Sequence, residues 1–370
     1  MNKIKILFFI QCLSYNGSLG GAEKVLITLV NNMNKDRFDI TVQTLCPDPF
    51  SCLISKDVKY KYCYSTNNAV TELLYRIEAE LGLVYPLYVK DDYDIEVAYL
   101  EYDATKVIAA STNKMAKKIA WVHKDFEKGL TDKQRFVRKT EGKYKKFDKV
   151  VCVSDKCKQS FDNLFSQRFE SVVIHNAIDE KEIRQKADDM TSIIKKRRYT
   201  ICTVGRLSQE KNHARLLKTC RRLTSEGFDF DLWIIGDGTQ RPQIEKYIRE
   251  HDLDTVVTLF GFQSNPYPFM KEADLLICSS DYEGFSTFVS EGVILGKPVF
   301  TTECSGMHEL LDDYAGGTIV KNDDDSFYLG LREYLRNNKK QELYVHEGFS
   351  LEKLVKDNEE LFESILTCNT

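Results

Sequence analysis

Two carboxylates, Glu283 and Glu291, stand at the ends of a short segment that follows an apolar run. Ser286 can cap a helix that begins at Thr287, and Gly296 stands just past the end of that helix. Glu291 lies one turn beyond Thr287, so the two side chains project from the same side. Free N–H groups at a helix start bind anions, and a carboxylate beside them accepts hydrogen bonds from sugar hydroxyls. The alternative is a pair of solvated acids around a helix N-terminus, where acids are favoured in any case, and the spacing alone does not separate the two interpretations.

A second candidate, residues 205–212, contains Arg206 and Lys211 directly after another apolar run. Arginine can bind two phosphate oxygens at once, and lysine adds a point charge. Cations placed in this way stabilise a departing diphosphate, on which negative charge grows as a sugar–phosphate bond breaks. The alternative is a surface turn with a basic tip.

Two weaker candidates come from the first half of the chain. Gly20 and Gly21 precede a helical pattern, where glycines permit a tight turn and a helix start favours an anion. They do not belong to a G-x-G-x-x-G pattern, which argues against a nicotinamide or flavin site. His123 ends an apolar run, and a buried histidine at a strand end is more often structural than catalytic.

The elements that must position these residues alternate between apolar runs and amphipathic segments. Nearly continuous apolar runs are typical of parallel strands covered on both faces, and helices between them give βαβ units. The predicted strands are 5–10, 38–45, 95–100, 118–123, 150–154 and 172–176, then 200–205, 231–236, 256–261, 274–280 and 298–302. The pattern restarts after the polar stretch 188–198, so the predicted fold class is α/β with two doubly wound, Rossmann-like domains in tandem.

The domain boundaries follow from this pattern. We expect residues 1–178 to form a first domain, residues 179–348 a second, and residues 349–370 a terminal helix that packs back across both. Two such domains facing each other form a central cleft, and ligands of open α/β sheets bind at the carboxyl ends of the strands.

The motifs resemble those of family 4 of the retaining glycosyltransferases, which have the GT-B fold. The resemblance is carried by E-G-F…E…G-K-P-V from Glu283, G-R-L-x-x-x-K-N from Gly205, G-G-A-E from Gly20 and N-A-I-D from Asn176. It covers nearly the whole chain and is sharpest over residues 205–309. The chain departs from the family where residues 291–296 read E-G-V-I-L-G instead of E-A-M-A-x-G, and where Ala177 replaces the usual glycine.

This resemblance implies a role for each candidate residue. Glu283 would lie by the transferred sugar, and Glu291 would bind the nucleotide ribose. Arg206 and Lys211 would hold the diphosphate, and His123 would contact a hydroxyl of the donor sugar. The other implied substrate-binding residues are two glycines beneath the donor phosphates, three residues around the helix start and one aromatic residue bordering the base pocket: Gly20, Gly21, Phe285, Ser286, Thr287 and Phe262.

We therefore predict a retaining glycosyltransferase that moves a sugar from a nucleotide-diphosphate sugar, with UDP-sugars favoured and GDP-mannose next. The acceptor would be a glycan or a lipid-linked saccharide in bacterial surface-polysaccharide or glycolipid biosynthesis. We predict metal-independent transfer without a cofactor, because the D-x-D pairs at 92–94, 229–231 and 252–254 follow no strand in a cleft context. The alternatives are a non-catalytic sugar-nucleotide-binding partner subunit and a sugar-nucleotide epimerase of the same fold.

Composition limits the partners and the compartment. The 370 residues carry a net charge of −4, which argues against a nucleic-acid partner. The 11 cysteines are odd in number and include no C-x-x-C pair, so we expect a reducing compartment and a cytoplasmic location. Lys3 and Lys5 before the first apolar run resemble a signal peptide, but Gln11 ends the run early, which favours a first strand.

One segment, residues 131–149, is strongly basic and also contains Phe136, Val137, Tyr144 and Phe147. Such a segment could form a basic amphipathic helix that lies on an anionic membrane surface, on the inner face of the cell membrane. The alternative is an ordinary solvated helix face. The resemblance favours the membrane hypothesis, because bacterial members of the family often use lipid-linked acceptors.

Overall fold

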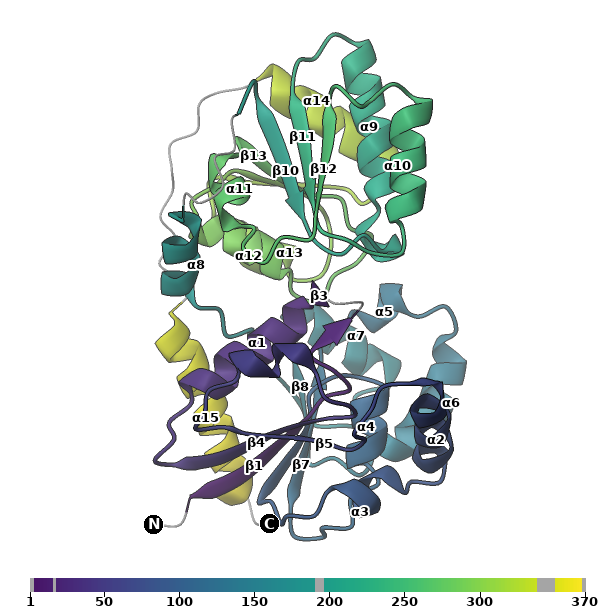
Figure 1. Ribbon diagram of the computed structural model, residues 1–370, viewed down its shortest axis with the longest axis vertical. Helices are drawn as coiled ribbons and strands as arrows, with labels where there is room; N and C mark the ends of the chain where they lie inside the picture. Colours follow the sequence, from purple (N-terminus) through teal and green to yellow (C-terminus); the bar gives the residue numbers. More distant parts are fainter. Residues whose placement is uncertain (1–2, 16–17, 190–195, 338–349, 368–370) are drawn as a thin grey trace. The chain divides into compact units, whose positions relative to one another are not determined.

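The computed structural model describes residues 3–15, 18–189, 196–337 and 350–367. The chain divides into two compact units, Met1–Ile178 with Leu351–Thr370, and Asp179–Ser350. Each unit has one main parallel sheet with helices around it (Figure 1). The predicted boundary at 348–349, and residues 190–195 of the polar stretch, lie outside the described residues.

The sheet of the first unit has the strand order β5-β4-β1-β6-β7-β8-β9, and its paired strands run parallel. Leu7, Phe8 and Phe9 of β1 (Ile4–Phe9) are fully buried, which explains the continuous apolar run in the sequence. The other strands are β4 (Phe38–Thr44), β5 (Lys59–Tyr62), β6 (Ile95–Ala98), β7 (Lys117–Val122), β8 (Lys149–Cys152) and β9 (Ser171–Val173). β2 (Ser14–Tyr15) and β3 (Ser18–Leu19) pair antiparallel in a small second sheet.

The helices of the first unit connect these strands. They are α1 (Gly21–Asn32), α2 (Ala69–Glu80), α3 (Val84–Tyr88), α4 (Asp103–Ile108), α5 (Phe126–Gly129), α6 (Lys133–Tyr144) and α7 (Asp155–Leu164), with a 3₁₀ turn η1 (Pro49–Leu53). Several helices begin at a side chain that accepts a hydrogen bond from their first turn, as Ser154 does from the N–H of Cys157. The sequence thus marks the helix starts as well as the buried strands.

The last helix, α15 (Leu351–Thr367), packs on the first unit. Its Phe362 is fully buried, and its ring lies 5.8 Å from that of Phe8 and 6.4 Å from that of Phe38. Glu359 of the same helix accepts a hydrogen bond of 2.6 Å from the backbone N–H of Asn34. The chain therefore returns to the first unit after the second unit is complete.

The sheet of the second unit has the strand order β12-β11-β10-β13-β14-β15, and its paired strands are also parallel. Its strands are β10 (Thr200–Val204), β11 (Asp231–Ile235), β12 (Val257–Gly261), β13 (Leu275–Cys278), β14 (Val299–Thr302) and β15 (Gly317–Val320). Its helices are α8 (Glu180–Ala187), α9 (His213–Ser225), α10 (Arg241–Glu250), α11 (Tyr267–Glu272), α12 (Thr287–Ile294), α13 (Met307–Leu311) and α14 (Asp324–Arg336), with a 3₁₀ turn η2 (Gln209–Lys211). The predicted α/β class is confirmed.

Candidate active site

Two loops of the second unit meet at the carboxyl edge of its sheet. β10 and β13 are neighbours in the sheet, so the loops that follow them leave the same edge side by side. The loop after β10 carries Arg206 and Lys211, and the loop after β13 carries Glu283. Parallel pairing of two buried strands thus brings the two strongest sequence motifs together.

Lys211 and Glu283 form an ion pair at this edge. Lys211 Nζ lies 2.6 Å from Glu283 Oε1, and the hydroxyl of Ser280 donates to the same oxygen at 2.7 Å. The side chain of Lys211 is 26% exposed and that of Glu283 is 12% exposed, so both charges are largely shielded from water. Burial lowers the pKa of Lys211, but the opposite charge and hydrogen bond of Glu283 outweigh burial, and the pKa ends above its ordinary value. Lys211 is therefore a permanent cation at neutral pH.

The pair lies in a small, partly open pocket. The ends of β10 and β13 form its floor, and Lys211, Glu283, Ser286 and Phe288 line it. This pocket lies wholly within the second unit. Its lining combines a fixed cation and a carboxylate in direct contact.

The helix predicted after Glu283 is present as α12. Ser286 precedes it and accepts a hydrogen bond of 3.4 Å from the N–H of Val289, and Gly296 follows its end with a φ of +67°. Phe285 is buried against the loop before α13, where a side chain at Gly306 would meet its ring at 3.0 Å. The predicted cap and helix end are confirmed, and the buried surroundings of α12 fix the direction of its N-terminus.

Glu291 lies inside α12 and is buried. The hydroxyl of Tyr267, from α11, donates a hydrogen bond of 3.0 Å to Glu291 Oε1. Burial and the adjacent carboxylate raise the pKa of Tyr267 well above its usual range, so its hydroxyl stays a donor. The sequence motif predicts Glu291 but not Tyr267, which belongs to no motif and reaches Glu291 from another helix.

Three other predicted residues lie near the same edge of the sheet. Arg206 lies in the loop after β10, ahead of η2, and is half-buried. Phe262 directly follows β12, two strands from β10, and is 42% exposed. Thr287 is the first residue of α12 and is half-buried. The structure therefore brings Lys211 and Glu283 into contact and leaves the other three around them.

His213 is a pocket residue that the sequence analysis missed. It begins α9 directly after Lys211 and Asn212, is 4% exposed and lines the pocket. Its Nδ1 is buried with no hydrogen-bond partner in the described part of the chain. Burial, followed by the charge of Lys211, lowers its pKa to about 4, so the ring is neutral at pH 7. The sequence feature that could have identified His213 is its position two residues after Lys211.

Acid should therefore weaken the second unit through His213. The folded pKa of about 4 lies below the ordinary 6.5, so the folded state binds the proton less well than the unfolded chain. The contribution of His213 to the free energy of unfolding is therefore fully present above pH 6.5 and is lost as the pH falls towards about 4. We expect His213→Gln to flatten this decline, measured by thermal unfolding at a series of pH values. His308→Gln, at an exposed histidine of the same unit, should keep the wild-type slope, and an unchanged slope for His213→Gln would contradict the assignment.

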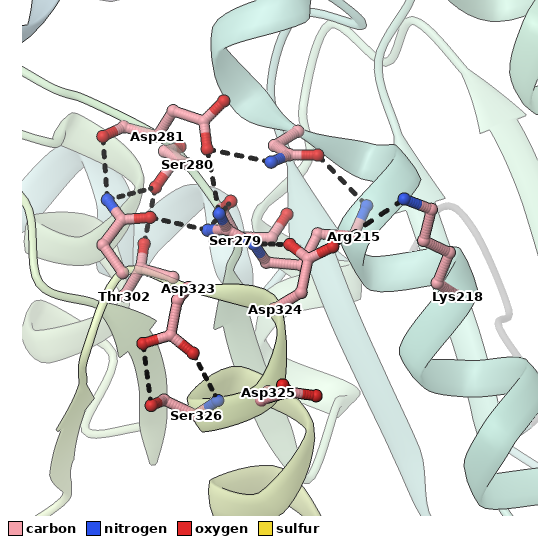
Figure 2. A network of polar contacts seen from close by, with 12 residues as sticks. Arg215, Lys218, Ser279, Ser280, Asp281, Thr302, Asp323, Asp324, Asp325 and Ser326 are labelled. Carbon is pink, nitrogen blue, oxygen red and sulfur yellow. Dashed lines mark hydrogen bonds and ion pairs between the residues drawn. The ribbon is translucent and has the colours of Figure 1, made fainter.

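A buried arginine ties the two site loops to a third element (Figure 2). Arg215 of α9 is 6% exposed and contacts Asp281 at 3.1 Å and Asp324 at 2.9 Å. Asp281 also accepts a hydrogen bond of 2.8 Å from Asn212, the residue after Lys211. Arg215 thus links the loop after β10, the loop after β13 and the start of α14.

Backbone contacts complete the connection between the loops. The hydroxyl of Ser279 donates to the carbonyl of Lys211 at 2.9 Å, and the N–H of Asp281 donates to the carbonyl of Glu210 at 2.8 Å. Ser280, which holds Glu283, has its own carbonyl fixed by the hydroxyl of Thr302 at 2.6 Å. These contacts hold the backbone on both sides of the Lys211–Glu283 pair.

The remaining predicted residues lie in the first unit. Gly20 precedes α1, and a side chain there would collide with the carboxylate of Glu23 at 2.0 Å; Gly21 is the first residue of the helix. His123 follows β7, its N–H donates to the carboxylate of Glu101, and its ring packs 4.9 Å from that of Tyr99. Burial lowers the pKa of His123 to about 3, and its Nε2 is buried with no hydrogen-bond partner among the described residues.

The described residues contain no group of three or more His, Cys, Asp or Glu side chains arranged to hold a metal ion. No helix in the described ranges is both long enough and apolar enough to cross a membrane.

The fold is that of the GT-B glycosyltransferases. The Anabaena protein Alr3699/HepE, whose crystal structure is in complex with UDP and glucose, superposes with a TM-score of 0.74 over 98% of this chain and 100% of its own. The two sequences are 17% identical, so this likeness concerns the fold alone.

The sequence comparisons also point to glycosyltransferases. Residues 185–349 match the family model of the glycosyl transferases group 1. A Campylobacter jejuni protein named N-acetylgalactosamine-N,N'-diacetylbacillosaminyl-diphospho-undecaprenol 4-alpha-N-acetylgalactosaminyltransferase is 34% identical over 48% of this chain and 47% of its own length. An uncharacterized glycosyltransferase of Haemophilus influenzae is 26% identical over 95% of this chain and 98% of its own.

These comparisons support the family 4 type of glycosyltransferase that the motifs predicted, and the match to the group 1 family model lies within residues 185–349. The chain spans about half the length of the first curated relatives that it matches, with 47% of one and 43% of another covered.

Proposed function

We propose that the protein is a retaining glycosyltransferase that transfers a sugar from a nucleotide-diphosphate sugar to a glycan or lipid-linked saccharide. The observation that carries this proposal is the contact of 2.6 Å between Lys211 and Glu283 inside the pocket of the second unit. Diphosphate departure requires a fixed positive charge, and a sugar requires an acceptor for its hydroxyls. In the pocket Lys211 is the positive charge, Glu283 is the hydrogen-bond acceptor, and the two are in direct contact.

Each residue then has a task at the reacting bond. Lys211 and Arg206 stabilise the charge that develops on the departing diphosphate, and this supply of charge requires no metal. Glu283 orients the transferred sugar and stabilises positive charge at its anomeric carbon. Glu291, held by Tyr267, accepts hydrogen bonds from the ribose. Ser286 and Thr287 present the N-terminus of α12 to phosphate oxygens.

The proposed donor is a UDP-hexose or a UDP-N-acetylhexosamine, with GDP-mannose second. Support comes from the Anabaena structure, which contains UDP and glucose, and from the Campylobacter relative, which is named as an N-acetylgalactosaminyltransferase. The name of that relative contains diphospho-undecaprenol, which supports a lipid-linked acceptor. In this proposal the second unit binds the donor, the first binds the acceptor through the Gly20–Gly21 loop, and His123 contacts the donor sugar.

A thermal-shift panel tests donor binding. UDP, GDP, ADP and their sugars are compared with the matching nucleosides, which lack phosphate. A diphosphate at 100 times its Kd should stabilise the folded protein by about 2.7 kcal/mol, and the nucleoside should have a much smaller effect because Lys211 and Arg206 have no phosphate to hold. If no nucleoside diphosphate raises the unfolding temperature, the proposed function is wrong.

Turnover separates the enzyme from a non-catalytic binding subunit. The donor chosen by the panel is incubated with the protein and an extract containing lipid-linked saccharides, and release of nucleoside diphosphate is measured. An enzyme transfers the sugar to the extract, whereas a binding subunit shows the thermal shift without release. Retention is then read from the anomeric configuration of the product.

A further inference from the structure

Helix α2 exposes an apolar row to solvent. Its apolar residues recur at helical spacing, so they lie along one face, while the buried residues of the helix are Tyr75 and Ala79. The α2 row consists of Val70, Leu73, Leu74, Ile77 and Leu81, with exposures from 42% to 76%. Leu83, just before α3, and Leu87, within α3, are also exposed. Seven of the 13 exposed large hydrophobic residues in the described ranges therefore fall within residues 70–87. An apolar patch of this kind indicates a binding partner.

A cluster of lysines lies at the C-terminal end of the same helix. Lys106 of α4 forms an ion pair with Glu80 of α2, and the charges of Lys139 and Lys143, from α6, act on the same carboxylate. These interactions place Lys139 and Lys143 of α6 near the C-terminal end of α2. Burial, and then the neighbouring Lys106, lowers the pKa of Lys143. Three lysines carry more positive charge than the single carboxylate of Glu80 neutralises, so positive charge remains available to an anionic partner.

The aromatic side of α6 faces the protein interior. The Phe136 ring packs 5.0 Å from that of Phe126, and the buried Tyr144 ring lies 5.2 Å from that of Phe161. The sequence analysis assigned both the charge and the apolar surface of a membrane contact to residues 131–149. In the structure α6 supplies basic side chains at the surface, and the exposed apolar side chains belong to α2.

We propose that the first unit binds an anionic membrane surface, with the α2 row entering the lipid interface and Lys106, Lys139 and Lys143 contacting lipid phosphates. An amphipathic helix binds a membrane through its apolar area together with attraction of basic residues to anionic lipid, and both features are adjacent here. A second copy of the chain fits less well, because a symmetric contact through the same patch brings two like-charged lysine clusters together. The inference does not depend on the donor, so it can fail while the proposed transfer stands.

Vesicle sedimentation of the full chain tests the proposal. We expect binding to vesicles of phosphatidylglycerol with phosphatidylcholine at low salt, and little binding to phosphatidylcholine alone. The double variant Leu73→Ser/Ile77→Ser should reduce the bound fraction at least fivefold. The matched control is Leu329→Ser, which alters a hydrophobic residue of α14 that is 55% exposed and should bind as wild type does.

The charge contribution is tested separately. Lys139→Gln, at an exposed position of α6, should weaken binding and make it less sensitive to salt. Each variant is also tested for the nucleotide-induced thermal shift, which should be unchanged, so that misfolding is detected. Wild-type binding by the double variant overturns the proposal. So does gel filtration in which wild type is dimeric and the double variant monomeric without lipid, since the row would then bind a second copy.

Discussion

Lys211→Ala should reduce the rate of sugar transfer by about 10²–10³-fold, the usual effect of removing one preorganised charge from a developing anion. The side chain is fixed by its contact of 2.6 Å with Glu283, so it needs no rearrangement when charge develops on the diphosphate. The measurement is the initial rate of nucleoside diphosphate release with the donor identified by the thermal-shift panel. The same variant should bind the nucleoside diphosphate more weakly and the nucleoside with unchanged affinity.

The partner of the lysine gives a second measurement. Glu283→Gln keeps the shape of the side chain and its contact with Ser280 but removes the negative charge. If Glu283 stabilises positive charge on the sugar, this variant should lose transfer while it keeps diphosphate binding, because Lys211 and Arg206 remain. The two variants therefore separate phosphate binding from stabilisation of the sugar.

A matched control guards against a general effect of lost lysine charge. Lys218 belongs to α9 of the same unit and is 59% exposed, so Lys218→Ala removes the same charge away from the pocket. It should keep wild-type turnover and nucleotide affinity. Turnover by Lys211→Ala equal to that of Lys218→Ala would contradict the role given to Lys211.

The central strands of both sheets could be predicted from the sequence, because their residues are buried on both faces. The apolar run of β1 and the run 200–205 of β10 are examples. The predictions missed β5 (Lys59–Tyr62) and β15 (Gly317–Val320), and both are edge strands. An edge strand has a neighbour on one side only, and β5 reads Lys-Tyr-Lys-Tyr with exposed and half-buried positions, so no apolar run marks it.

The candidate site was predictable in part for a similar reason. Lys211 and Glu283 are 72 residues apart, yet parallel pairing of β10 with β13 brings their loops to one edge, and each loop carries a motif. Tyr267 and Arg215 carry no such motif. Their contacts depend on how α11 and α9 pack against the site loops, which is a property of tertiary structure. Sequence patterns therefore identify groups that act on a ligand more readily than groups that hold them.

Arg215→Met should destabilise the second unit by about 3 kcal/mol, the lower end of what removing one partner from a buried ion pair costs. The lower end applies because Asp281 and Asp324 are 42% and 57% exposed, so water can solvate them once the guanidinium is gone. Methionine fills much of the volume but makes none of the hydrogen bonds. The effect is measured as a fall in the unfolding temperature of the second unit, with and without bound nucleotide.

The same change should also act on turnover, although Arg215 itself lines no part of the pocket among the described residues. Asp281 connects Arg215 to Asn212, the residue after Lys211, and lies two residues before Glu283. Loss of the contact between Arg215 and Asp281 should therefore loosen the backbone near both Lys211 and Glu283. We expect kcat to fall by about tenfold, and the donor KM to change less, because misplacement by about 1 Å is enough to slow a reaction strongly. Hydrogen exchange of the amides of residues 279–283 should become faster in the variant.

Lys218→Met is the control for Arg215→Met, since Lys218 is 3.7 Å from the same Asp324 but 59% exposed. An exposed ion pair contributes about 0–1 kcal/mol, so this variant should unfold, exchange and turn over nearly as wild type does. Arg215→Lys should fall between the two, because one ammonium group cannot reach Asp281, Asn322 and Asp324 at once as the guanidinium does. A variant Arg215→Met with reduced stability but wild-type kcat would mean that the network supports the fold and leaves the Lys211–Glu283 geometry unaffected, and the positioning role would be rejected.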